Sequence, residues 1–94
     1  MKHHIIVKWN ETVTDKQGIL EEVRDLYGGA DRIEGIRSVS LYPNCVDRPN
    51  RYDLMIVLEM DPDALSRWDD CSIHHRWKTE YGNRIGSKAI FDCE

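Results

Sequence analysis

The sequence has little of what marks a secreted, membrane-bound or nucleic-acid-binding protein. Its 94 residues include three cysteines, Cys45, Cys71 and Cys93, an odd and widely spaced set. We therefore expect reduced thiols in the cytoplasm rather than a disulfide framework. No apolar run approaches the roughly 20 residues of a membrane span. A net charge of -4 offers no basic excess for binding nucleic acid.

The composition that remains is that of one small folded domain. Hydrophobic residues make up 40% of the chain and charged residues 32%, which is typical of a globular protein rather than a disordered one. We expect a single domain over 1–94 with a small core.

Alternating apolar residues predict four strands, at 2–9, 36–42, 51–60 and 87–93. In the third, residues from Tyr52 to Met60 alternate onto one face, while Met55 and Val57 make the other face apolar as well. A strand that is apolar on both sides needs cover on both sides. The sheet is therefore expected to have no face fully open to water.

Two helical segments separate these strands, at 14–27 and 61–81. Thr14 and Gln17 match a capping box at the start of the first helix, and Gly28 with Gly29 forms a natural stop. The second segment opens with Asp61 and Pro62, a favourable start for a helix.

The second helical segment carries two apolar stripes that point in different directions. Trp68 belongs to the first stripe, and Trp77 and Tyr81 to the second, nearly opposite at about 100° per residue. One straight helix cannot bury both, so we predict a break near Cys71–Ser72, with Ser72 as the new cap. That break would put His74 among large aromatic rings, where we expect any site.

The predicted order is β-α-β-β-α-β, an α+β ferredoxin-like fold. Helices on one side leave the other sheet face bare although its residues are apolar. A second copy of the chain, bound by two-fold symmetry, is the simplest cover, so we expect a homodimer through the sheet face.

Several short patterns, in this order, resemble the stress-responsive A/B barrel (Dabb) family. They are the opening Lys2-His3-x-Ile5-x-Val7, the third strand opening at Tyr52–Asp53, the interrupted helix through Trp68 and His74, and the ending Ile90–Phe91–Asp92. The resemblance implies a dimeric α+β barrel in which two four-stranded sheets face each other.

The resemblance extends distantly to a plant branch of the family, olivetolic acid cyclase, which closes a polyketide ring between sheet and helices. It implies that His74 is the catalytic histidine and that His3 borders the pocket. The catalytic tyrosine of that branch falls on Trp68, which has no phenol. The implied site residues besides His74 are His3, Ile5, Val7, Tyr27, Trp68, Cys71 and Trp77.

Two functions follow as hypotheses. The first is a Dabb-type module that binds a small apolar or aromatic molecule in this pocket without chemistry. The alternative is a cofactor-free enzyme (a cyclase, isomerase or oxygenase) with His74 as general base. Cys71 and His74 have the spacing of half a zinc site, but only His3 or Cys93 could complete it, so we expect no metal and no cofactor.

Overall fold

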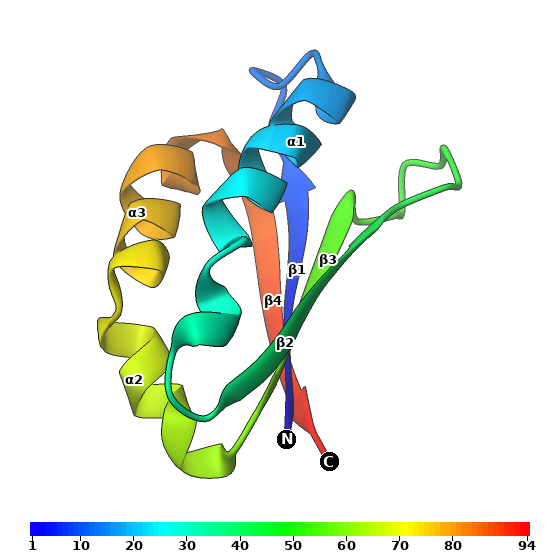
Figure 1. Cartoon of the computed structure of the whole chain (residues 1–94). Coiled ribbons are helices and arrows are strands. Elements are labelled where there is room, and N and C mark those ends of the chain that lie inside the picture. Colours follow the sequence, from blue (N-terminus) through cyan, green and yellow to red (C-terminus); the bar gives the residue numbers. More distant parts are fainter.

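The computed structural model describes the whole chain, Met1–Glu94. Four strands form one antiparallel sheet in the order β2-β3-β1-β4, and the helices lie together on one side of it (Figure 1). This arrangement confirms the predicted ferredoxin-like α+β fold. The elements, in chain order, are β1 (Lys2–Trp9), α1 (Lys16–Tyr27), β2 (Ile36–Pro43), β3 (Leu54–Met60), α2 (Leu65–Asp70), α3 (Ser72–Tyr81) and β4 (Ile85–Cys93).

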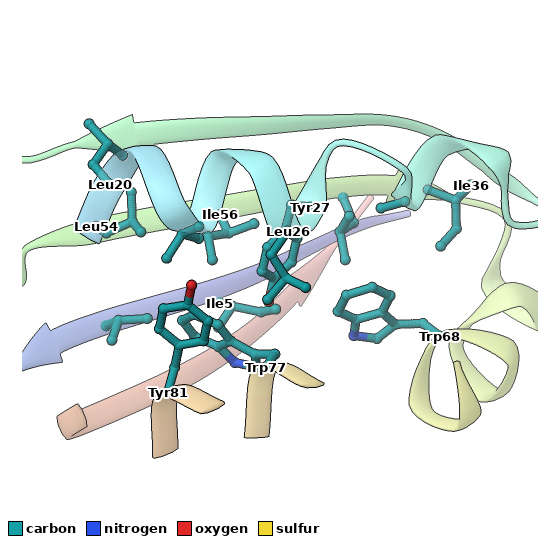
Figure 2. Packing of buried hydrophobic residues seen from close by; sticks show 14 of the residues in the cluster. Ile5, Leu20, Leu26, Tyr27, Ile36, Leu54, Ile56, Trp68, Trp77 and Tyr81 are labelled. Atoms are coloured by element: carbon teal, nitrogen blue, oxygen red, sulfur yellow. The ribbon is translucent and has the colours of Figure 1, made fainter. Parts of the chain in front are cut away.

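The core lies between the sheet and the helices and is rich in aromatic rings. Trp77 is at its centre: its ring centroid lies 6.2 Å from that of Trp9, 5.5 Å from that of Tyr27 and 5.4 Å from that of Tyr81. Figure 2 shows Trp68, Trp77 and Tyr81 reaching from α2 and α3 toward the sheet. Edge-to-face and offset ring pairs of this kind add to the free energy gained from apolar burial.

The first helix begins one residue later than the capping box predicted. Asp15, not Thr14, is the N-cap, and its Oδ1 accepts a hydrogen bond from the backbone N–H of Gly18 at 2.9 Å. A Cβ at position 18 would lie 2.4 Å from the Asp15 carboxylate. The glycine therefore leaves room for the cap, a role that offsets its weak helix propensity.

The predicted break in the second helical segment is confirmed. Cys71 separates α2 from α3 with an extended backbone (φ -76°, ψ 159°). The predicted cap was wrong by one residue: the Cys71 sulfur accepts from the backbone N–H of His74 at 3.3 Å, and Ser72 is the first residue of α3. The turn lets Trp68 and Trp77 both enter one core, although their stripes lie on opposite sides of a straight helix.

The third strand is shorter than predicted because regular pairing with β1 stops after Asp53, whose backbone N–H still donates to the carbonyl oxygen of Val7 at 2.8 Å. The carboxylate of Asp53 accepts from the backbone N–H of Trp9 at 2.8 Å, in the place of the next backbone partner. Tyr52 consequently lies outside the sheet and is exposed, rather than sharing the buried face of Leu54. None of the three helices is long and apolar enough to cross a lipid bilayer.

Candidate functional site

Five of the residues proposed to line a pocket form the closed centre of the core. Ile5, Val7, Tyr27, Trp68 and Trp77 are each at most 2% exposed. None of them lines the surface hollows of about 420, 280 and 200 Å³, because the indole rings fill the space between sheet and helices (Figure 2). A ligand at this position would require the rings to move.

His74 lies at the edge of this core, beside the turn between α2 and α3. It is half-buried, and its ring centroid is 5.2 Å from that of Trp68. Its Nδ1 lies 3.1 Å from the carbonyl oxygen of Asp69, near the end of α2. If Nδ1 donates to that carbonyl, Nε2 is the nitrogen able to accept a proton. The backbone of His74 is fixed by the Cys71 sulfur, which is half-buried next to it.

His3 makes its side-chain contact with the last strand, not with His74. Its Nδ1 is 2.5 Å from Oδ1 of Asp92, its antiparallel partner on β4. The His3 side chain is nearly enclosed, whereas the Asp92 carboxylate is partly open to solvent. The pair joins the β1 and β4 strands by a charge-assisted hydrogen bond when the imidazole is protonated.

Two polar atoms inside the aromatic core have no hydrogen-bond partner in the protein. They are the hydroxyl of Tyr27 and the Nε1 of Trp68, on rings whose centroids lie 5.5 Å apart. Burial, and to a lesser degree the nearby Cys71 thiol, raises the pKa of the Tyr27 phenol well above its ordinary value. Such unpaired groups are uncommon in folded proteins.

A hollow of about 420 Å³ opens at the other end of the α1–sheet layer. Figure 1 shows the β2–β3 loop at the same end of the sheet as the start of α1. Between them, Trp9, Leu20 and Leu54 form a buried apolar floor (Figure 2 shows Leu20 and Leu54). The remaining lining residues are Lys16, Gln17, Pro43, Asn44, Cys45, Val46, Asp47 and Asp53.

The walls of this hollow are held by contacts between distant parts of the chain. Lys16 Nζ donates to Oδ1 of Asp53 at 2.9 Å, which ties α1 to the start of β3. The ammonium of Lys8 donates to the carbonyl oxygens of Pro49 and Arg51, at 3.2 and 2.9 Å. The carboxylate of Asp53 is the first cause of the raised pKa of Lys16, which keeps this ammonium charged. These contacts hold the β2–β3 loop in place as one wall of the hollow.

The sequence patterns did not predict this hollow, although some of its residues belong to recognisable patterns. Its lining comes from the ends of β1 and β2, the start of β3, the first turns of α1 and the β2–β3 loop. Only Trp9, Leu20 and Leu54 follow an apolar period, and such a period predicts burial rather than a ligand site. The available signal was Asp53, a carboxylate directly before an apolar strand, where a charged group usually has a partner.

No family model matches the sequence, and no curated protein matches it. Solved structures do. A dimeric ferredoxin-like protein of unknown function from Thermobifida fusca superposes with a TM-score of 0.80 at 18% identity, over 96% of this chain and 85% of the other.

Two further structures share the fold at lower identity. A Dabb family protein with a ferredoxin-like fold from Mesorhizobium loti gives a TM-score of 0.75 at 11% identity, covering 99% of this chain and 93% of that one. A hydroxynitrile lyase from Passiflora edulis gives 0.74 at 9% identity, covering 96% and 87%. The chain thus has the ferredoxin-like α+β fold of a Dabb family protein, and the resemblance in its sequence patterns is confirmed at the level of the fold.

Proposed function

We propose that this protein binds a small, largely apolar or aromatic molecule in the hollow between α1 and the β2–β3 loop. The observation that carries the proposal is the contrast between floor and rim. Trp9, Leu20 and Leu54 give a buried apolar floor, while Lys16 and Asp53 stand at the wall. Ligand sites commonly combine apolar lining with a few fixed polar groups, in volumes of about 300–1,000 Å³.

Filling the hollow tests this function. Val46 lies in the exposed loop and lines the hollow, so Val46→Trp should occupy the space without disturbing the core. We expect a set of apolar aromatic fragments, detected by ligand-observed NMR, to bind the wild-type protein and not this variant. Tyr52→Trp, in the same loop but outside the lining, is the matched control and should bind like wild type. Equal binding to both variants would show that the ligands lie elsewhere.

We also propose that two copies associate through the sheet face opposite the helices. In the single chain, the apolar residues of this face are half-buried or exposed. Phe91 is 59% exposed and Tyr42 is 54% exposed. The strand pairing sets Val57, His4 and Phe91 in one row and Met55, Ile6 and Ala89 in the next. An apolar centre of this kind favours a second copy of the same chain, and the Thermobifida fusca structure is described as dimeric.

A cytoplasmic location is part of the same proposal. Cys45, Cys71 and Cys93 are all free thiols, and Cys45 is exposed. An exposed, unpaired thiol is most stable in a reducing compartment.

The alternative, a cofactor-free enzyme with His74 as general base, is favoured by one observation. Beside His74 lies Trp68, whose Nε1 has no partner, and beside Trp68 lies the equally unpartnered hydroxyl of Tyr27. A substrate with two acceptor oxygens would satisfy both donors while Nε2 of His74 removed a proton. We rank this enzyme function second because the space around Trp68 is filled. Variants of His74 and Tyr27 separate the two functions.

A further inference from the structure

The hydrogen-bonding capacity left over in the α1–loop hollow indicates what kind of head group its ligand carries. Each oxygen of Asp53 already accepts one hydrogen bond: Oδ1 from Lys16 and Oδ2 from the backbone N–H of Trp9. Asn44 is closed on its own loop, with its side chain accepting from the backbone N–H of Val46 and donating to its carbonyl oxygen. Both side chains are therefore tied into the fold, with part of their hydrogen-bonding capacity already used within the protein.

Donors remain free. An ammonium has three N–H groups, and Lys16 uses one on Asp53, so two are left at the wall of the hollow. The side chain of Lys16 is 64% exposed, while that of Asp53 is only 12% exposed, so Asp53 is the fixed end of the pair and the ammonium is the accessible one. A ligand should therefore offer an acceptor oxygen to Lys16.

The charges at the rim disfavour an anionic head. Lys16 and Asp53 cancel each other as an ion pair, and Asp47 adds a carboxylate that also acts on the Lys16 ammonium. The three charged lining residues sum to one negative charge, which repels a carboxylate or phosphate. A cationic head in contact with Lys16, the accessible group of the ion pair, would meet a like charge at short range.

We infer that the hollow accepts an uncharged carbonyl compound with a small apolar ring, its ring on Trp9, Leu20 and Leu54 and its carbonyl oxygen at the Lys16 ammonium. This inference rests on the proposed function and specifies the ligand of the same site. The ring fits the apolar floor, and the volume of about 420 Å³ sets a limit near the lower end of ordinary ligand sites. The polar requirement is one acceptor and no charge.

Four probes of similar shape test the head group on the intact protein. Acetophenone has the neutral carbonyl, ethylbenzene has none, benzoate is anionic and benzylamine cationic. Each is titrated while the backbone amides of Leu20, Val46 and Leu54 are followed by two-dimensional NMR. We expect acetophenone to bind roughly tenfold more tightly than the other three, since a hydrogen bond from a charged donor is among the stronger ones.

Variants of Lys16 identify the donor. Lys16→Met should lower the affinity for acetophenone to that for ethylbenzene, while Lys16→Arg, which keeps a cationic donor, should retain the preference. Lys78→Met removes an exposed lysine from α3, far from the lining, and should change nothing. Tighter binding of benzoate than of acetophenone, or a preference for acetophenone that survives Lys16→Met, would overturn the inference.

The outcomes separate this inference from the function on which it rests. Equal binding of acetophenone and ethylbenzene to the wild-type hollow would leave the apolar site in place and overturn the carbonyl specificity. Absence of any shift at Leu20, Val46 and Leu54 with all four probes at millimolar concentration would overturn the binding function itself, and the head-group inference with it.

Discussion

The rings of His74 and Trp68 lie 5.2 Å apart, at an interplanar angle of 41°, across the turn between α2 and α3. The same imidazole is 3.1 Å from the carbonyl oxygen of Asp69, so it contacts both the core and the end of α2. His74 thereby closes the edge of the aromatic core. This position accounts for a histidine among aromatic residues without requiring a reaction.

His74→Ala should therefore cost stability. We expect a loss of about 1–3 kcal/mol in the free energy of unfolding, from the lost ring contact and hydrogen bond, with ligand binding in the α1–loop hollow unchanged. Chemical denaturation and the fragment titration measure the two effects. His75→Ala is the control, because that side chain is exposed and should contribute little. A His74→Ala protein with full stability and a lost catalytic activity would instead support the enzyme.

Periodicity located the strands, the helices and the break, because burial on one face imposes a regular spacing on the chain. It correctly predicted that Trp68 and Trp77 both lie in one core. It could not show whether that interior keeps a cavity, since this depends on how closely the two indole rings pack with Tyr27. Five of the predicted lining residues are therefore buried in the closed core: Ile5, Val7, Tyr27, Trp68 and Trp77.

The hollow could not be predicted from periodicity for a different reason. Its walls depend on Lys16 with Asp53 and on Lys8 with the carbonyl oxygens of Pro49 and Arg51, contacts across 37 to 43 positions of the sequence. Nothing in the local sequence pairs these residues. The caps show the same limit on a smaller scale. Thr14 and Asp15 are both good capping residues, and at the start of α3 the good capping residue Ser72 is passed over for the sulfur of Cys71.

The turn at Cys71 makes proline acceptable at the next position. Ser72 is the first residue of α3, and Cys71 before it has the extended backbone that a residue before proline prefers. Ser72→Pro should change the free energy of unfolding by less than about 1 kcal/mol. Thr79→Pro, inside α3, should destabilise by about 3 kcal/mol. Thermal denaturation compares the two, and an equal loss in both would mean that the helix is continuous through residue 71.

The sheet face can be tested by placing a charge at its apolar centre. Val57→Asp and Phe91→Asp each put a carboxylate where a second chain should bind, and a buried unpaired charge costs several kcal/mol. Sedimentation at micromolar concentration should show a dimer for the wild-type protein and a monomer or unfolded chain for both variants. Thr79→Asp adds the same charge on the exposed side of α3 and should remain dimeric. A compact wild-type monomer would rule out this interface.

Removing the buried hydroxyl of Tyr27 should stabilise the protein if nothing binds it. The hydroxyl has no partner, so Tyr27→Phe removes an unsatisfied group at a gain of about 1 kcal/mol near pH 7. A functional hydroxyl predicts the same gain but with loss of activity or ligand binding, so the variant is measured for both. A Tyr27→Phe protein less stable than wild type near pH 7 would show that the hydroxyl has a partner.

The same phenol gives stability a definite dependence on pH. Burial raises the pKa of Tyr27 in the folded protein, whereas in the unfolded chain the phenol ionises near pH 10. Burial of the neutral phenol contributes fully to the free energy of unfolding below that pH. This contribution is lost as the pH rises toward the folded-state pKa. Denaturation from pH 7 to pH 11 should show a shallower alkaline decline for Tyr27→Phe than for wild type. Tyr81→Phe is the comparison, because burial and Glu22 raise the pKa of that phenol less, and its decline should change less. Identical slopes for wild type and Tyr27→Phe would mean that the Tyr27 phenol is open to water.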